Sequence, residues 1–477
     1  MKKEKDGKFK DKIFAYALKN AIEHNGKALS NNVLNSLFHE GLDKKDIKSV
    51  IPKINKIVEK INSLSLEEQK EKFSSLDKEV SHREERAGLP ELENVPKTGV
   101  VMRFAPSPSG PMHIGHAATG MPSSLYVKKY GGKFFIRIED TNPKNIDPQA
   151  YSMIRDEANW LFGNVSEFII QSDRMKKYYD FAEKLINKGE AYVCDCNPEE
   201  FKKLLKKSKP CPCRTLSAKE QLARWKKMLD KKGYLEGKAV LLFKSDLKHK
   251  NPALRDFPLA RIIKTKHPKQ GTKYRVWPLM NLSVTADDIE YGMTHIIRAK
   301  EHKDNALRQE MMYKVLGERK FPKTFFLGRY KFTDLEISCS KTKKLIEEGK
   351  FSGWNDIRLP FLAALRKRGY QPEAFEKMAI QRGISEVDKV IHEEDFFETL
   401  NNFNRQILKI KSEMVSFEKA GSKDKNSLEI LMPNNSLIYC KSNLDKKTIK
   451  EGALFYFDGF GYCRYNKSEN QFWFCHK

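Results

Sequence analysis

The stretch Arg103–His116, RFAPSPSGPMHIGH, constrains the fold more than any other part of the sequence. The apolar run Gly99–Phe104 predicts a buried strand, and residues from Ala117 onward predict a helix, with a Pro/Ser/Gly loop between them. A strand, a loop and a helix N-terminus form a phosphate site, because free backbone N–H groups and the positive end of the helix dipole face the ligand. His113 and His116 can add hydrogen bonds to a phosphoryl group.

The histidine pair has two other interpretations. It could ligate a metal, although the third ligand and the general-base Glu of a zincin site are missing beside it. It could also be an incidental pair. The sequence contains neither the dinucleotide fingerprint G-x-G-x-x-G nor a P-loop, so a nucleotide site would have to use the strand, loop and helix described above.

The whole string resembles the signature of class I aminoacyl-tRNA synthetases, and its APSPSG portion resembles the glutamyl-tRNA synthetase version. YALKNAIEHNGKA near the N-terminus resembles the helical extension of archaeal-type members, and NPALRD, THIIRAKEH and SGWNDIRLP also fit that family. The resemblance thins beyond about residue 400. It implies a glutamate–tRNA ligase that activates L-glutamate with ATP and Mg²⁺ and transfers it to tRNA(Glu).

The second half of such an ATP site is expected at Ile337–Lys341, ISCSK, which resembles the mobile lysine loop of class I enzymes. The common pattern of this loop has a lysine at the position of Glu336 and a different residue at that of Cys339. Archaeal-type members often carry only the last lysine of the pattern, which is Lys341 in this sequence. The resemblance implies that His113, His116 and Lys341 are catalytic. It also implies an ATP site made of His113, Gly115, His116, Ser338, Ser340 and Lys341.

The amino-acid pocket is predicted from charge. Arg103 at the end of the first strand suits a carboxylate, Glu139 after the next strand suits an ammonium group, and Arg298 is a second cation. The resemblance implies that glutamate is held by Arg103, Ser107, Glu139 and Arg298. Each of these residues could alternatively form a surface or structural ion pair.

Two features near this pocket qualify the resemblance. Met280 stands where bacterial-type relatives have a tyrosine near the substrate side chain, so the recognition of that side chain transfers only in part. Asp287 and Asp288 are predicted to be structural.

Four cysteines form a C-x-C…C-x-C pattern, and they are Cys194, Cys196, Cys211 and Cys213. Four thiolates in two close pairs suit tetrahedral Zn²⁺, and glutamyl enzymes resemble this arrangement, with a zinc near the domain that binds the acceptor stem. The alternative is four reduced thiols in an apolar fold. Eight cysteines in 477 residues are too few for a disulfide scaffold.

The formal net charge of +26 favours a polyanionic partner, with nucleic acid first and an acidic membrane second. Two lysine clusters are either phosphate contacts for an RNA helix or solvated helix faces. They are Lys202, Lys203, Lys206, Lys207 and Lys209, and Lys226, Lys227, Lys231 and Lys232. The sequence shows no secretory signal and no run of about 18 apolar residues, so we expect a cytoplasmic protein without membrane contact.

The expected fold is α/β and multidomain, with a Rossmann-like class I catalytic domain. The predicted parts are a helical N-terminal extension with a linker at its end (1–97), the first catalytic half (98–190), an inserted acceptor-stem and zinc domain (191–270), the second catalytic half with the lysine loop (271–341), a helical stem-contact domain (342–404) and a shortened, β-barrel-like anticodon-binding domain (405–477).

Several alternatives stay open. Asn142 in EDTNP is a glutaminyl-like letter, whereas the APSPSG and EDTNP strings as a whole favour the glutamyl enzyme over glutaminyl-tRNA synthetase. A non-discriminating enzyme that also charges tRNA(Gln) is a further possibility. The alternatives of other classes are a catalytically silent tRNA-binding paralogue and a small-molecule nucleotidyltransferase that shares the histidine motif.

Overall fold

The computed structural model describes residues 10–24, 26–43, 46–76, 79–80, 88–318, 320–424 and 427–477. The chain divides into two compact units, Met1–Arg86 and Ala87–Lys477. The predicted linker covers residues 84–97, of which 84–87 lie outside the described residues. Across the described ranges, no helix is both long enough and apolar enough to cross a membrane.

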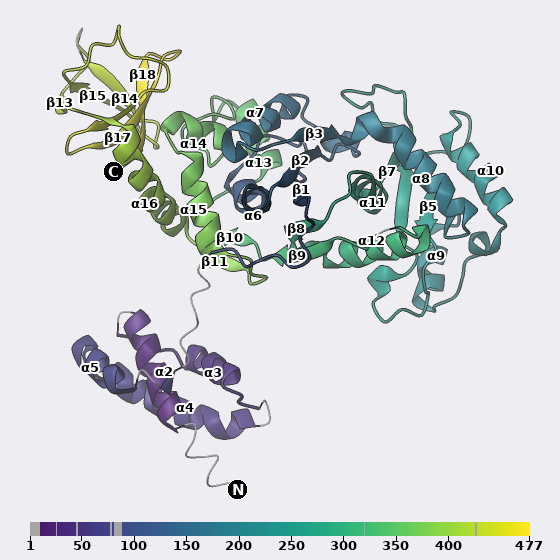
Figure 1. Ribbon diagram of the computed structural model, residues 1–477, viewed down its shortest axis with the longest axis horizontal. Coiled ribbons are helices and arrows are strands. Elements are labelled where there is room, and N and C mark those ends of the chain that lie inside the picture. Colours follow the sequence, from purple (N-terminus) through teal and green to yellow (C-terminus); the bar gives the residue numbers. More distant parts are fainter. Residues whose placement is uncertain are drawn as a thin grey trace. The chain divides into compact units, whose positions relative to one another are not determined.

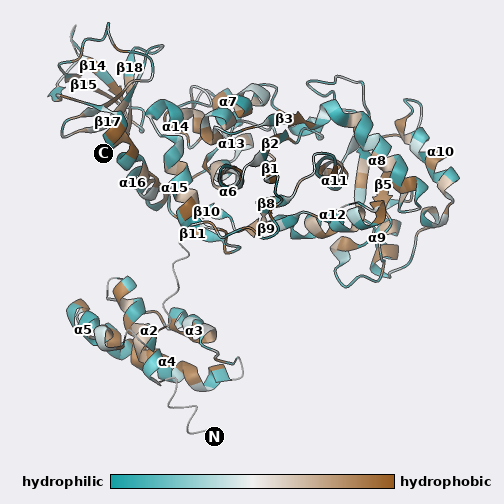
Figure 2. Cartoon of the chain, in the orientation of Figure 1, coloured by the Kyte–Doolittle hydropathy of each residue, from teal (hydrophilic) through white to brown (hydrophobic). Residues whose placement is uncertain are grey.

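The first unit is helical over its described residues. Its helices are α2 (Lys10–Glu23), α3 (Ser30–His39), α4 (Ile47–Asn62) and α5 (Leu66–Leu76). Hydrophobic and hydrophilic residues alternate around them (Figure 2), and in α4 the residues at helical spacing, Val50, Ile54, Val58 and Ile61, are all buried. The described part of the predicted N-terminal extension is therefore helical, as expected.

The second unit is built on parallel strands from both halves of its sequence. They are β1 (Val100–Phe104), β2 (Gly132–Ile138), β3 (Glu167–Ile170), β8 (His295–Ala299) and β9 (Lys323–Leu327). β2 pairs in parallel with β1 and with β3, and β8 pairs in parallel with β9. Val101 of β1 is hydrogen-bonded to Thr294, directly before β8, at 2.9 and 3.0 Å. The strands β1 and β8 thus lie side by side (Figure 1).

Helices pack against these strands and bury them. They are α6 (Ile114–Tyr130), α7 (Ala150–Phe162), α8 (Met175–Asn187), α11 (Met280–Glu290) and α12 (Lys303–Leu316). The last five residues of β2 are all buried, as is typical of a parallel strand covered on both faces. At the first residue of β2, Gly132 has φ +111°, and a Cβ atom there would lie 2.1 Å from the carbonyl oxygen of Val100. Only glycine allows β2 to start this close to β1.

Between the two halves of the parallel strands, the chain forms a separate antiparallel sheet. Its strands are β4 (Ala191–Cys194), β5 (Val240–Phe243), β6 (Pro258–Ile262) and β7 (Val276–Pro278), and its helices are α9 (Pro198–Lys206) and α10 (Ala218–Leu229). Trp225 of α10 is completely buried in the core of this region. Because β7 pairs with β6, this sheet continues past residue 270.

A mostly helical segment follows the parallel strands. It contains β10 (Tyr330–Phe332), α13 (Cys339–Glu347), α14 (Leu362–Arg368), α15 (Pro372–Arg382), β11 (Lys389–Ile391) and α16 (Glu393–Lys411). Helices α14, α15 and α16 contribute to the same hydrophobic core as β1, β2 and α6. This segment therefore supports the histidine loop from one side.

The C-terminal part is a seven-stranded sheet in the order β12-β16-β17-β18-β14-β15-β13. The strands are β12 (Glu413–Val415), β13 (Glu418–Ala420), β14 (Leu428–Leu431), β15 (Leu437–Lys441), β16 (Leu454–Phe457), β17 (Gly461–Asn466) and β18 (Gln471–His476). Its aromatic side chains are largely core residues, since Phe457, Phe472 and Trp473 are at most 5% exposed. This sheet agrees with the expectation of a β domain at the C-terminal end of the sequence.

Candidate active site

The loop between β1 and α6 is fixed by hydrogen bonds to distant segments. The carbonyl of Pro106 accepts a hydrogen bond from the N–H of Glu139 at 3.0 Å, and that of Met112 accepts from Leu362 at 2.9 Å. The N–H of Met112 donates to the buried carboxyl group of Glu157 at 2.6 Å. Burial raises the pKa of Glu157 to about 8. The loop is therefore shaped by the protein before a ligand binds.

The two histidines form the N-terminal cap of α6. The Nδ1 atom of His113 accepts a hydrogen bond from the N–H of Gly115 at 3.1 Å, and Nδ1 of His116 accepts from the N–H of His113 at 3.3 Å. The two rings are stacked with centroids 3.8 Å apart. A Cβ atom on Gly115 would lie 2.9 Å from the ring of His113, so this position accepts only glycine while the ring keeps its place.

These contacts fix the protonation of both rings. Burial lowers the pKa of His116 to about 4, and burial together with His116 lowers the pKa of His113 well below its usual value. Both rings are thus neutral near pH 7. Because each Nδ1 accepts a backbone N–H, the ring proton lies on Nε2. Each histidine therefore offers one Nε2–H donor to a ligand at the helix N-terminus.

The ISCSK segment lies directly beside this loop. The thiol of Cys339 is 3.8 Å from the carbonyl oxygen of Pro111. The Cδ1 atom of Ile337 is 3.7 Å from the point that a Cβ atom on Gly115 would occupy. The fold therefore brings the two halves of the predicted ATP site together, although they are far apart in the sequence.

Lys341 lies in the first turn of α13, and its ammonium group pairs with an acidic neighbour. Ser338 caps this helix by accepting a hydrogen bond from the N–H of Lys341. The Glu336 carboxylate is 2.8 Å from Nζ of Lys341 and accepts the N–H of Ser338 at 2.9 Å. The hydrogen bond to Glu336 raises the pKa of Lys341. Both charged side chains are largely exposed, so a triphosphate can compete for the ammonium group.

Charged side chains from three strand ends meet at Asp288 of α11. Arg103 of β1 approaches its carboxylate at 3.3 and 3.5 Å, and Arg137 of β2 approaches at 2.5 Å. Arg298 of β8 lies 4.0 Å away. Arg137 also contacts Glu139 at 3.1 Å. Asp288 and Arg137, which were not predicted to be part of the pocket, thus connect the three predicted residues. These are Arg103, Glu139 and Arg298.

Arg298 is the least neutralised member of this cluster. It is 7% exposed, and its Nη1 donates to the side-chain oxygen of Gln309 at 3.0 Å. Burial and the proximity of Arg103 lower the pKa of Arg298 to about 9. Its Nε and Nη2 atoms have no hydrogen-bond partner among the described residues. A carboxylate could accept hydrogen bonds from both.

The other predicted ligands take different positions. Ser107 and Ser340 are exposed, whereas the hydroxyl of Ser338 already accepts a hydrogen bond as the N-cap of α13. Met280 begins α11, and its sulfur accepts a hydrogen bond from the side-chain amide of Asn305 at 3.5 Å. The structure places these residues but does not assign them a ligand.

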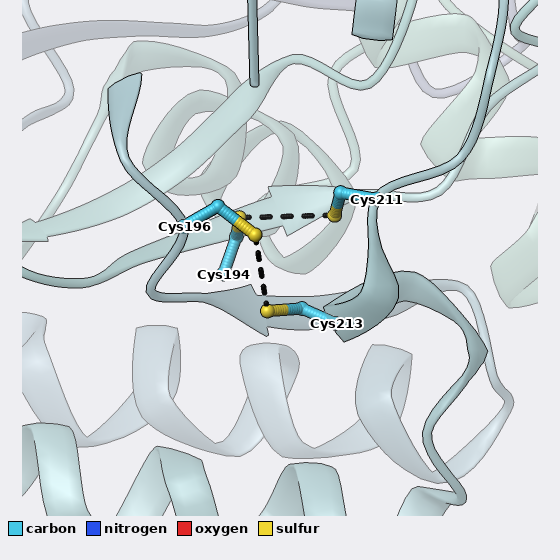
Figure 3. A group of neighbouring side chains, drawn as sticks. All are labelled: Cys194, Cys196, Cys211 and Cys213. Carbon is cyan, nitrogen blue, oxygen red and sulfur yellow. Dashed lines mark hydrogen bonds between the residues drawn. The ribbon is translucent and has the colours of Figure 1, made fainter. Parts of the chain in front are cut away.

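The four predicted cysteines converge in the antiparallel sheet domain (Figure 3). Their sulfur atoms all lie within 4.8 Å of one another, with Cys194–Cys211 at 3.8 Å and Cys196–Cys213 at 3.5 Å. A tetrahedron of sulfurs about 2.3 Å from Zn²⁺ has edges of about 3.8 Å. Nη1 of Arg224 lies 3.3 Å from the sulfur of Cys213.

A basic cleft of about 620 Å³ adjoins this cluster. Its cationic lining residues are Lys144, Lys202, Lys238, Arg255, Arg261 and Arg308. The nine lysines of the two predicted clusters are all exposed, on and after α9 and α10. The inserted domain therefore combines a candidate metal site with a surface suited to phosphate.

The comparisons with known proteins agree with this geometry. The family described as "tRNA synthetases class I (E and Q), catalytic domain" matches residues 99–409. The chain belongs to this family. It is an aminoacyl-tRNA ligase, and the family uses ATP with Mg²⁺.

The relatives include three archaeal proteins named glutamate–tRNA ligase. That of Methanocaldococcus jannaschii is 48% identical over 79% of this chain and 68% of its own length. Those of Methanothermobacter thermautotrophicus and Pyrococcus abyssi are 41% and 43% identical, over 83% and 82% of this chain and 71% and 69% of their own lengths. A solved glutamate tRNA ligase from Elizabethkingia meningosepticum is 18% identical, with a TM-score of 0.46 over 66% of this chain and 70% of its own.

Sequence reasoning missed several residues of this site. Glu157 and Gln309 lie in helices without a local motif, whereas Arg137 and His302 lie near or within quoted strings but were not assigned to the site. His302 follows β8, where burial and the charge of Arg298 lower its pKa. One signal was available, since Arg137 and Glu139 form an R-x-E pair at the end of a predicted strand.

The capped histidines give a prediction for NMR. With imidazole nitrogens labelled, His116 should be the neutral Nε2–H tautomer at pH 7 and titrate with a midpoint near pH 4. Between that value and about 6.5, the unfolded chain binds a proton that the folded chain does not, so the free energy of unfolding should fall as the pH is lowered. A midpoint near 6.5, assigned with His116→Asn, would contradict the burial of this ring, and a proton on Nδ1 would contradict the cap geometry.

Proposed function

We propose that this ligase activates L-glutamate with ATP and transfers it to the 3′ end of tRNA(Glu). One observation carries the proposal: Arg103, Glu139 and Arg298 meet at the ends of β1, β2 and β8, beside the helix capped by the two histidines. Two cations and one anion complement the two carboxylates and one ammonium group of glutamate. The names of the archaeal relatives support the same substrate.

In the proposed first step, a carboxylate oxygen of glutamate attacks the α-phosphorus of ATP, and pyrophosphate leaves. The protein contributes orientation and charge stabilisation, with little covalent chemistry. The Nε2–H groups of His113 and His116 would donate to phosphate oxygens at the N-terminus of α6. Lys341 would leave Glu336 and bind the same phosphates, while Gly115, Ser338 and Ser340 would line the ATP site.

In the proposed glutamate pocket, Glu139 binds the ammonium group, Arg103 the reacting carboxylate and Arg298 the side-chain carboxylate, with Ser107 at the exposed edge. The assignment of the two arginines follows from connectivity. β1 runs directly into the loop that leads to the histidines, so the end of the substrate that reacts with ATP lies nearer to Arg103 than to Arg298.

We further propose that the inserted domain binds the acceptor end of the tRNA and holds a structural Zn²⁺ on Cys194, Cys196, Cys211 and Cys213. The basic cleft and the exposed lysines support the RNA contact. We place the end of this domain near residue 278 and not at the predicted residue 270, because β7 pairs with β6 of the same sheet. We also propose that the C-terminal sheet contacts the anticodon, that the protein is cytoplasmic, and that the other parts have the boundaries predicted from the sequence.

Aminoacylation of purified tRNA(Glu) and tRNA(Gln), with glutamate and glutamine offered in turn, tests the proposed function. The chain should charge tRNA(Glu) with glutamate, and His116→Ala or Lys341→Ala should lower the rate by about 10²–10³-fold. Lys344→Ala is the matched control, because Lys344 is an exposed lysine on the same helix and pairs only weakly with Glu348 at 3.9 Å.

The pattern of charging separates the alternatives. Charging of both tRNAs with glutamate would indicate a non-discriminating enzyme, and charging of tRNA(Gln) with glutamine would indicate the glutaminyl type. No charging in any combination would refute the proposal and leave a tRNA-binding paralogue.

Metal analysis tests the zinc proposal. The purified chain should contain about one equivalent of Zn²⁺ per molecule, and Cys213→Ser should lose it, since a tetrahedral structural site needs all four ligands. Cys440→Ala, which removes a buried thiol from the C-terminal sheet, should keep the metal. Zinc well below one equivalent in the unmodified chain would contradict the proposal.

A further inference from the structure

The side chain that holds Arg298 is neutral. Gln309 of α12 is 1% exposed, and its oxygen accepts a hydrogen bond from Nη1 of Arg298 at 3.0 Å. The nearest carboxylate, that of Asp288, lies 4.0 Å from Nη2 and is shared with Arg103 and Arg137 at shorter distances. The positive charge of Arg298 is therefore positioned by an amide and only weakly neutralised.

Several buried polar atoms of Arg298 and of nearby residues lack a hydrogen-bond partner among the described residues. Nε and Nη2 of Arg298, Nε2 of Gln309 and the hydroxyl of Tyr313 have no hydrogen-bond partner among the described residues. Gln309 and Tyr313 are four residues apart on α12 and therefore lie on the same face. Tyr313 is close to the cluster, since Tyr313 and Asp288 line the same cavity.

All four of these atoms can donate a hydrogen bond. Buried donors without partners are costly, so a ligand that supplies acceptors is favoured at this place. An ionised carboxylate only accepts hydrogen bonds, whereas the amide of glutamine also brings an NH₂ group that needs an acceptor. The set therefore fits the side chain of glutamate better than that of glutamine.

We propose that Gln309 determines the preference for glutamate over glutamine, by positioning Arg298 without neutralising it. Tyr313, on the same face of α12, is a further buried hydroxyl donor beside this cluster. This inference rests on the proposed function and deepens it. Gln309 acts through Arg298 and is therefore a positioning residue.

Replacing Gln309 by glutamate changes the charge with little change in shape. One carboxylate oxygen would keep the hydrogen bond from Arg298, and the other would replace an Nε2 atom that has no partner among the described residues. The new carboxylate would form a buried ion pair with Arg298. The fold should tolerate this pair, but the pocket would no longer present a free positive charge to the substrate.

The experiment is steady-state aminoacylation of tRNA(Glu) by the full chain, with L-glutamine as a competitive inhibitor. Gln309→Glu should raise the KM for glutamate about 30-fold or more, as expected when a buried charge loses its partner. The KM for ATP and the inhibition constant of glutamine should change less than about threefold. The melting temperature should not fall.

Three further variants make the result specific. Gln309→Met, a neutral residue of similar size, should raise the KM for glutamate less than Gln309→Glu does. Tyr313→Phe removes a hydroxyl without a partner among the described residues, so it should fold normally and raise that KM about 10-fold or more. Glu310→Gln, the reverse exchange at the next position of α12, should behave like the unmodified chain.

Two results would overturn the inference. One is an equal loss for glutamate and glutamine, or for Gln309→Glu and Gln309→Met, because either would indicate a role in packing only. The other is an unchanged KM for glutamate in both Gln309→Glu and Tyr313→Phe. If the unmodified chain itself charges no tRNA, the proposed function fails instead, so the two failures are distinguishable.

Discussion

The carboxylate of Asp288 is the interaction on which the architecture of the site depends. It is 1% exposed and meets Arg103 from β1, Arg137 from β2 and Arg298 from β8. Burial raises the pKa of this carboxyl group, but the three guanidinium groups lower it by a larger amount. The pKa of Asp288 therefore lies below its usual value. The group is thus charged when buried, as a carboxylate that bridges several arginines must be. It fixes α11 against the strand ends where the substrate is expected.

This arrangement leaves one charge incompletely neutralised. Arg103 and Arg137 have carboxylates within 3.5 Å, whereas Arg298 has an amide at 3.0 Å and a shared carboxylate at 4.0 Å. Burying the charge of Arg298 away from water without a close carboxylate costs free energy. A substrate carboxylate would supply the missing partner. The incomplete neutralisation of Arg298 therefore destabilises the free protein and favours substrate binding.

Much of the site could be predicted because its chemistry is concentrated in short motifs. The RFAPSPSGPMHIGH string predicts a strand, a loop and a helix start, and the structure has β1, a fixed loop and α6 in this order. The four cysteines converge as their spacing predicts. The strand-end positions of Arg103 and Glu139 also follow from the alternation of strands and helices.

The rest depends on contacts that local patterns do not encode. Asp288 was predicted to be structural, which agrees with its ion pairs, but its partners come from three strands that only the fold assembles. Gln309 lies among ordinary helix residues, and only its contact with Arg298 gives it significance. Gly115 is explained by the ring of His113 folding over it, which spacing alone cannot show. The pairing of Lys341 with Glu336 likewise depends on how the loop before α13 folds, which no local pattern predicts.

A crystal structure with L-glutamate and an unreactive ATP analogue tests the central claim most directly. The account predicts a substrate carboxylate oxygen about 2.7–3.2 Å from Nε or Nη2 of Arg298, with the contacts of Asp288 to Arg103 and Arg137 retained. A bound glutamate with both carboxylates away from Arg298, or an Asp288 released from its arginines, would contradict it.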